Sequence, residues 1–178
     1  LDDSRVFTLR SLPDMDAIIQ ALAQKPSHVT VVGGGFIGLE MVEALRHRDL
    51  AVTLLELSPQ VMAPIDPEMA AIAHEKLQQQ KVDLRLRTGL QAIDAKPEAL
   101  YLQLGSGDCL KTEMLILAIG VKPETQLAKQ AGLALGEKGG IAVDAYLRTS
   151  DACIYAVGDA IETPDFTTGL HGVVPFAG

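Results

Sequence analysis

The stretch HVTVVGGGFIGLEMVEALRHRDLAVTLLELS, residues 28–58, holds a glycine-rich turn between an apolar run and a helical pattern. Residues 29–32 form a continuous, mostly β-branched run, which is typical of a strand buried on both faces of a parallel sheet. After the glycines, apolar residues recur at i, i+4 and i+8, so we predict a helix over residues 36–47. A second apolar run covers residues 51–55. The stretch therefore predicts a strand–turn–helix–strand unit, with the helix's apolar stripe made by Ile37, Met41 and Leu45.

The glycines of this turn follow the pattern G-x-G-x-x-G at Gly33, Gly35 and Gly38. Such a string alone is weak evidence, but a strand before it, a helix after it and an acidic residue ending the next strand make it specific. Gly33 permits the tight turn, Gly35 lets a pyrophosphate approach the backbone, and Gly38 lets the helix pack near the strand. The helix N-terminus then offers N–H groups and a positive dipole end to the phosphates. We predict a dinucleotide site.

Glu56 is the acidic residue that ends the next strand, 18 positions after Gly38. A carboxylate there can accept hydrogen bonds from the adenosine ribose hydroxyls and would repel a 2′-phosphate. The residues around it, ELSPQ, include no Arg that could bind such a phosphate. This pattern favours NAD over NADP. The alternative interpretation, a solvated charge at the end of a strand, stays open at this point.

Phe36 and Glu40 lie one helical turn apart in the first turns of the predicted helix, so they share a face. In one interpretation, Phe36 packs against the protein and Glu40 complements the helix dipole. In the other, this face lies toward the group that receives the hydride. The sequence does not choose between them.

Helical and strand patterns continue along the rest of the chain. A short helix is predicted between Pro13 and Pro26, and Asp66-Pro67-Glu68 is a typical start for another, with Asp66 as the N-cap. Short runs separated by turn residues over 90–111 predict an antiparallel meander. The buried stripe of the helix after Asp66 is predicted to be Met69, Ile72, Ala73 and Leu77. Further strands are predicted at 82–86, 114–118, 141–143 and 154–157, and a short helix at 124–131.

Composition and charge exclude several classes of protein. Hydrophobic residues make up 48% of the chain and charged residues 21%, which indicates a globular protein. The net charge of −8 argues against nucleic-acid or anionic membrane partners. No apolar run approaches the roughly 20 residues of a membrane span, and the N-terminus shows no signal-peptide pattern. We expect a cytoplasmic protein.

Cysteines and histidines give no metal or disulfide pattern. Cys109 and Cys153 are far apart, and we predict two buried or half-buried thiols in a reducing compartment. The four histidines have no metal-ligand spacing, so we predict no metal site.

Three motifs, VVGGGFIGLE, LAIGVKPET and IYAVGDAIE, occur in an order that resembles the FAD- and NAD(P)-dependent pyridine nucleotide–disulfide oxidoreductase family. The stretches VFTLRSLPDMDAI and GGIAVDAYLRTSDACIYAVGDAIE are most similar to its coenzyme A-disulfide reductase and NADH oxidase branch. The resemblance covers essentially the whole chain. It implies an α/β fold: a Rossmann-like parallel sheet with helices on both faces and an antiparallel β-meander, plus a partial FAD-domain segment.

The resemblance also implies the roles of individual residues. Phe36 matches an aromatic that covers the nicotinamide-facing side of the flavin, and Glu40 matches a carboxylate near the reacting rings. Gly120 matches the glycine of an Ala-Thr-Gly turn, although Ile119 here replaces the threonine. The implied NAD site contains Gly33, Gly34, Gly35, Phe36, Ile37, Gly38, Glu40, Glu56 and Gly120, and the implied FAD contacts are Gly158, Asp159 and Ala177.

The family's first FAD motif and its redox-active cysteine do not occur in these residues, and the chain begins without Met. We therefore expect a fragment: residues 1–27 as a lead-in from the FAD domain, 28–119 as the NAD(H)-binding domain and 120–178 as the returning segment of the FAD domain. No catalytic residue is expected within it. In the full-length homodimer, hydride would pass from NADH to FAD and on to a small-molecule disulfide, peroxide or oxygen.

Two other functions compete with this one. The chain could be a free-standing Rossmann module that senses NAD(H). It could also be a simple NAD dehydrogenase, for which His171 and Tyr146 are the available acid–base residues, although neither has a recognisable partner.

Overall fold

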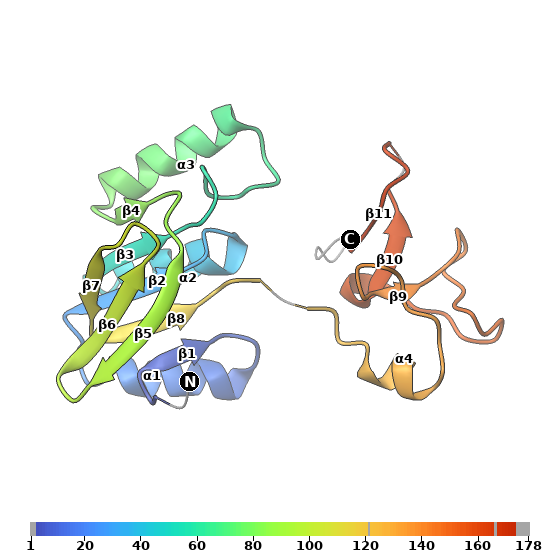
Figure 1. Cartoon of the computed structure of the whole chain (residues 1–178), viewed down its shortest axis with the longest axis horizontal. Helices are drawn as coiled ribbons and strands as arrows, with labels where there is room; N and C mark the ends of the chain where they lie inside the picture. Colours follow the sequence, from blue (N-terminus) through green and yellow to red (C-terminus); the bar gives the residue numbers. More distant parts are fainter. Residues whose placement is uncertain (1–2, 121, 166, 174–178) are drawn as a thin grey trace. The chain divides into compact units, whose positions relative to one another are not determined.

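The computed structural model describes residues 3–120, 122–165 and 167–173. The chain divides into two compact units, Leu1–Gly120 and Val121–Gly178. The helices and strands of each unit are labelled in Figure 1. The first unit contains the predicted dinucleotide site.

A five-stranded parallel sheet forms the centre of the first unit, in the order β1-β8-β2-β3-β4. The central strand β2 therefore has β3 on one side and β8, which returns from much later in the sequence, on the other. Ligands of such sheets bind outside the carboxyl ends of the strands where the order reverses. The strands are β1 (Val6–Thr8), β2 (His28–Val32), β3 (Ala51–Leu55), β4 (Asp83–Arg85) and β8 (Met114–Leu117).

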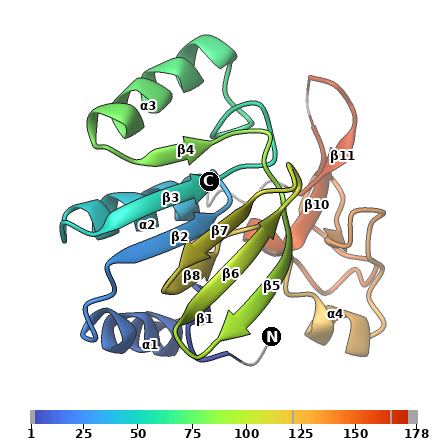
Figure 2. The same ribbon diagram turned by 60° about the vertical axis from the view of Figure 1, so that its left-hand side comes forward.

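Two different layers cover the faces of this sheet (Figure 2). The helices α1 (Leu12–Leu22), α2 (Phe36–Arg46) and α3 (Pro67–Gln79) contribute Ile18, Met41, Val42, Leu45 and Leu77 to one core cluster. A meander of β5 (Leu90–Lys96), β6 (Ala99–Leu104) and β7 (Cys109–Thr112) covers the other face with Leu100, Leu102 and Leu104. The parallel sheet and the meander are confirmed, but the second face carries the meander where a helix layer was expected.

Strand residues alternate between these two cores because successive side chains of a strand point to opposite faces. In β3, Leu54 packs with the helices and Leu55 with the meander, and both are fully buried. This double burial explains why β2, β3 and β8 are mostly apolar along their whole length instead of alternating with exposed polar residues.

The helix α3 differs from its prediction in the face that it buries. Ala70 and Leu77 are buried, whereas Met69 and Ile72 are 58% and 63% exposed. The predicted stripe was therefore wrong for Met69 and Ile72, because the helix lies with Ala70 and Leu77, seven positions apart, toward the protein. Asp66 is at the N-cap position as predicted, but its side chain makes no capping hydrogen bond.

The second unit is built from short elements: α4 (Gln126–Gln130), a 3-10 turn η1 (Gly158–Ala160), and a three-stranded sheet in the order β11-β10-β9. Its strands are β9 (Ile141–Ala142), β10 (Ile161–Pro164) and β11 (His171–Gly172). Glu162 of β10 is only 2% exposed, and its Oε2 accepts hydrogen bonds from the N–H groups of Lys138 and Gly140.

The buried strand predicted at residues 154–157 is wrong. Tyr155 forms only an isolated bridge with Arg148, and Tyr155 and Val157 are 62% and 68% exposed. The backbone of this segment pairs locally instead: the Thr149 N–H donates to the Ile154 carbonyl at 2.9 Å, and the Ala156 N–H donates to the Leu147 carbonyl at 3.0 Å. The strand forms later, as β10.

The stretch expected to be a lead-in contributes to the first unit. β1 pairs in parallel with β8, with Phe7 opposite Ile116, so it is an edge strand of the main sheet. The assignment of residues 1–27, 28–119 and 120–178 to parts of an NAD and an FAD domain stays a prediction.

A substitution of Leu54 tests which residues form the core. Because this side chain is fully buried among the helices, Leu54→Ala should lower the free energy of unfolding by about 2–5 kcal/mol. Denaturant unfolding measures the change. The matched control is Leu12→Ala, since Leu12 is 81% exposed and its loss should change stability by no more than about 0.5 kcal/mol. Equal effects of the two variants would contradict the assigned core.

His28 should make stability depend on pH. Burial lowers the pKa of its imidazole, whose nitrogens contact Thr112 Oγ1 at 3.0 Å and Thr53 Oγ1 at 2.9 Å. The unfolded chain therefore takes up this proton first as the pH falls below about 6.5. The contribution of neutral His28 to the free energy of unfolding is therefore fully present above that pH. It is lost as the pH falls through the pKa of His28 in the folded protein. Unfolding between pH 7.5 and 5.5 should be steeper in pH for the wild type than for His28→Gln; equal slopes would refute the assignment.

Candidate dinucleotide site

The turn after β2 is held by its neighbours on both sides. The Gly33 N–H donates to the Leu55 carbonyl at 2.8 Å, and the Ala118 N–H donates to the Val32 carbonyl at 2.7 Å. Gly33 has a φ of +108°, and a Cβ there would lie 2.3 Å from the Ala118 oxygen. Both the backbone conformation and the space therefore require glycine.

Gly38 and Gly35 have opposite surroundings. A Cβ on Gly38 would lie 1.8 Å from the Gly33 oxygen, so glycine lets α2 approach the turn closely. Gly35 is the N-cap of α2, is exposed, and a Cβ there would meet nothing within 4 Å. The first helical hydrogen bond runs from the Leu39 N–H to the Gly35 carbonyl at 3.0 Å. Open space thus lies in front of a helix N-terminus, as an anion site requires.

Glu56 lies beside this turn at the end of β3. Its Oε2 accepts the Gly34 N–H at 2.6 Å, and its Oε1 accepts the Ser58 N–H at 2.7 Å. The half-buried carboxylate is therefore fixed by two backbone donors. A carboxylate has about four acceptor positions, so two hydrogen bonds leave capacity for the vicinal hydroxyls of a ribose.

Of the other α2 residues predicted to belong to the dinucleotide site, some lie on the surface and one packs in the core. Phe36 is 50% exposed and Glu40 is exposed, and their i, i+4 spacing places them on the same face. Ile37 instead packs against the core cluster with Met41. The side chain of Ile37 is therefore partly buried and anchors the start of α2 to the core.

Gly120 follows β8, the strand that neighbours β2. Its φ is +95°, a Cβ would meet nothing within 4 Å, and the preceding Ile119 is 73% exposed. Because parallel neighbours end at the same edge of a sheet, this turn and the glycine-rich turn lie at one edge.

The predicted FAD residues belong to the second unit. Gly158 has a φ of +80°, and Asp159 lies with Lys122 and Lys138 on the wall of a cavity of about 750 Å³. Ala177 lies outside the described residues. His171 in β11 and Tyr146, which is 76% exposed with its ring 5.6 Å from the Arg148 guanidinium, also belong to this unit.

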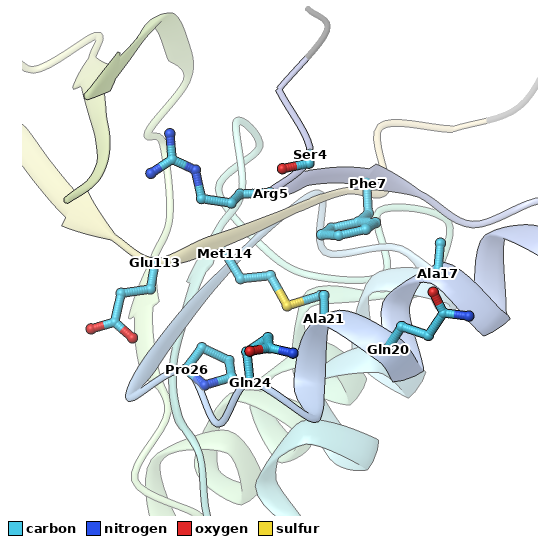
Figure 3. Close-up of a pocket in the computed structure, with 10 residues that line it drawn as sticks. All are labelled: Ser4, Arg5, Phe7, Ala17, Gln20, Ala21, Gln24, Pro26, Glu113 and Met114. Atoms are coloured by element: carbon cyan, nitrogen blue, oxygen red, sulfur yellow. The ribbon is translucent and has the colours of Figure 1, made fainter. Parts of the chain in front are cut away.

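Another pocket, of about 550 Å³, lies in the first unit between β1, the end of α1 and the start of β8 (Figure 3). Phe7, Ala21 and Met114 line its apolar part, while Arg5 and Glu113 carry the charges. Arg5 is bound to Asp3 at 2.7 Å, and Glu113 accepts hydrogen bonds from Ser27. Met114 begins its strand, so this pocket lies toward the amino ends of the strands and away from the glycine-rich turn.

The sequence did not predict that the loop after Glu56 contacts the glycine-rich turn. Val61 is fully buried and packs on Gly34, whose Cβ would lie 2.9 Å from Val61 Cγ1. The Met62 N–H donates to the Gly34 carbonyl at 2.8 Å, and His74 of α3 accepts the Val61 N–H. The run SPQVMAPI shows no periodic pattern that indicates such contacts.

Both cysteines differ from their prediction. Cys109 and Cys153 are free and exposed, because one lies on an outer strand of the meander and the other in a surface turn, where its N–H donates to Asp151. Among the described residues, no group of three or more His, Cys, Asp or Glu side chains is arranged to hold a metal ion. Within the same residues, no helix is long and apolar enough to cross a membrane.

Comparison with known proteins identifies the family. Residues 2–171 match the family model described as pyridine nucleotide-disulphide oxidoreductase, and the chain belongs to this family. The resemblance predicted from the three motifs is confirmed. Membership implies NAD(H) and FAD as cofactors.

Three proteins of known name or structure are similar to the chain over nearly its whole length. It is 39% identical to an NADH oxidase of Methanocaldococcus jannaschii, over 96% of this chain and 38% of that protein. It is 36% identical to an NAD(P)H coenzyme A polysulfide/persulfide reductase of Pyrococcus horikoshii, over 97% of this chain and 39% of that protein. The crystal structure of reduced CoADR-RHD from Bacillus anthracis matches with a TM-score of 0.89 and 50% identity, covering 97% of this chain and 31% of that one. The chain thus spans less than two fifths of each.

Gly38 and Gly35 provide a matched test of the turn. Gly38→Ala should lower the free energy of unfolding by about 2 kcal/mol or more, because its Cβ would meet the Gly33 carbonyl. Gly35→Ala adds the same methyl group in open space at the N-cap and should cost no more than about 1 kcal/mol, the usual disadvantage of Ala at that position. Thermal or denaturant unfolding of both variants checks this; a stable Gly38→Ala protein would show that α2 does not pack as described.

Proposed function

We propose that the chain is the NAD(H)-binding module of a flavoprotein oxidoreductase that passes hydride from NADH to FAD and on to a disulfide, peroxide or oxygen. The observation that carries this proposal is the open space at Gly35, at the N-terminus of α2, next to the fixed carboxylate of Glu56. The names of the relatives, which include NADH oxidase and coenzyme A polysulfide/persulfide reductase, support the reaction class.

Each part of the site would bind a different part of the dinucleotide. The N-terminus of α2 would hold the pyrophosphate, since its backbone can be approached without a side chain at Gly35. Glu56 would accept hydrogen bonds from the adenosine ribose hydroxyls. Gly120, in a turn at the same edge of the sheet, would lie beside the nicotinamide end.

The cofactors themselves supply the hydride chemistry. The protein's contribution is to orient the two rings and to exclude water, so no acid–base side chain is needed in this step. Phe36 and Glu40, exposed on one face of α2, would form the surface turned toward the flavin. Gly158 and Asp159 would contact the flavin's ribityl chain, and Asp159 lies on the wall of the cavity in the second unit.

We further propose that the residues selecting the electron acceptor, and the homodimer contacts, belong to the parts of the relatives that this chain does not match. The 178-residue chain by itself should bind NADH weakly, bind FAD little or not at all, and show no reductase turnover. Stoichiometric FAD in the purified chain would contradict this.

Nucleotide selectivity tests the role of Glu56. NADH should bind at least about tenfold more tightly than NADPH, because a 2′-phosphate would lie against the carboxylate. Calorimetric titration with both nucleotides measures the ratio, and Glu56→Gln should reduce it by removing the charge. Glu43→Gln is the control, since Glu43 is an exposed carboxylate farther along α2. Tighter binding of NADPH by the wild type would refute the proposal.

A further inference from the structure

The loop between Glu56 and α3 has a fixed conformation. The Ile65 N–H donates to the Met62 carbonyl at 2.9 Å, and the Gln60 Nε2 donates to the Ile65 carbonyl at 2.8 Å. Met62 has a φ of +51°, which is uncommon for a residue with a side chain. Such a backbone conformation persists only where surrounding contacts determine it.

Two contacts join this loop to the glycine-rich turn, and both reach Gly34. The Met62 N–H donates to the Gly34 carbonyl, and the buried Val61 side chain packs against the Gly34 Cα. The Gly34 N–H in turn donates to Glu56 Oε2 at 2.6 Å. The backbone at Gly34 therefore links the loop directly to the carboxylate that faces the ribose site.

His74 of α3 makes a further contact with this loop. It is half-buried in α3, and its Nε2 accepts the Val61 N–H at 3.2 Å. The imidazole must be unprotonated at Nε2 to accept this bond, so the ring proton is on Nδ1. Because Val61 is fully buried, its N–H would lose its acceptor without His74.

We propose that His74 is a positioning residue for the adenosine-ribose end of the dinucleotide site. It acts through Val61 and Met62 on the Gly34 backbone, and through Gly34 on the orientation of the Glu56 carboxylate. This inference rests on the proposed NAD(H) function, and it makes α3 contribute to nucleotide selectivity through the position of Glu56.

Two substitutions of His74 distinguish the loss of its hydrogen-bond acceptor from the loss of its side-chain volume. His74→Leu replaces the ring with an apolar side chain of similar size that has no acceptor, whereas His74→Gln supplies an amide oxygen that can accept the Val61 N–H. His47→Leu is the matched control, because His47 follows α2 with its side chain 75% exposed. The probes are ADP-ribose, NADH and NADPH, titrated calorimetrically into the 178-residue chain, with thermal unfolding of every variant.

His74→Leu should bind ADP-ribose roughly tenfold more weakly than the wild type, and His74→Gln within about twofold of it. The ratio of the NADPH to the NADH dissociation constant should also fall toward one in His74→Leu and recover in His74→Gln. A loss of stability alone would weaken both nucleotides equally, so the ratio reports the position of Glu56. His47→Leu should match the wild type in both measurements.

Three results would overturn the inference: wild-type affinity and selectivity in His74→Leu, equal weakening of NADH and NADPH, or a His74→Gln variant as weak as His74→Leu. If His74→Leu does not fold, the binding and selectivity of His74→Gln and the amide hydrogen exchange of Val61 in the wild type test the inference. We expect the Val61 amide to be strongly protected from exchange. Rapid exchange would contradict the hydrogen bond from the Val61 N–H to His74. A wild-type chain that binds neither ADP-ribose nor NADH would instead refute the proposed function.

Discussion

The contact between the start of α2 and the turn after β2 is the constraint on which the rest of the site depends. Gly38 lies against the Gly33 carbonyl, and Gly33 lies against the carbonyl of Ala118. A side chain at Gly38 would push α2 away from the turn, and one at Gly33 would push the turn away from the end of β8, so the two glycines together set where α2 begins. With that position fixed, Gly35 is at the helix N-terminus with open space before it. A pyrophosphate can then meet backbone N–H groups and the positive end of the helix dipole together.

The carboxylate of Glu56 connects this turn to the neighbouring strand and to the loop beyond it. Its two backbone donors, Gly34 and Ser58, come from different segments, so its orientation depends on both. Because Met62 also binds Gly34, the loop and the turn form one hydrogen-bonded unit. In the proposed site, discrimination against a 2′-phosphate would therefore depend on this whole unit as well as on the charge of Glu56.

Much of the first unit could be predicted from the sequence because its strands are buried on both faces. The run at β8 is apolar throughout, the runs at β2 and β3 are mostly apolar with one buried threonine each, and the helical stripe of α2 is regular. The glycine pattern and Glu56 have fixed spacing, so their proximity also followed from the sequence. The prediction of a buried strand at residues 154–157 was wrong because a run of four apolar residues is compatible with a buried strand and with a local hairpin alike.

The loop from Ser58 to Ile65 could not have been predicted, since its conformation comes from contacts rather than from periodicity. A positive φ at Met62 and a hydrogen bond to a histidine thirteen residues away leave no mark in the local sequence. The exposed face of α3 has a similar cause: an apolar pattern shows which residues can be buried, but packing decides which are.

The most direct test of the central claim is to follow backbone amide chemical shifts of the chain by NMR during titration with NADH. The account predicts that the largest changes occur at residues 33–38 and at Glu56 and Ser58, where phosphate and ribose would bind. Changes confined to the pocket between β1 and α1, around Phe7, Ala21 and Met114, would contradict it.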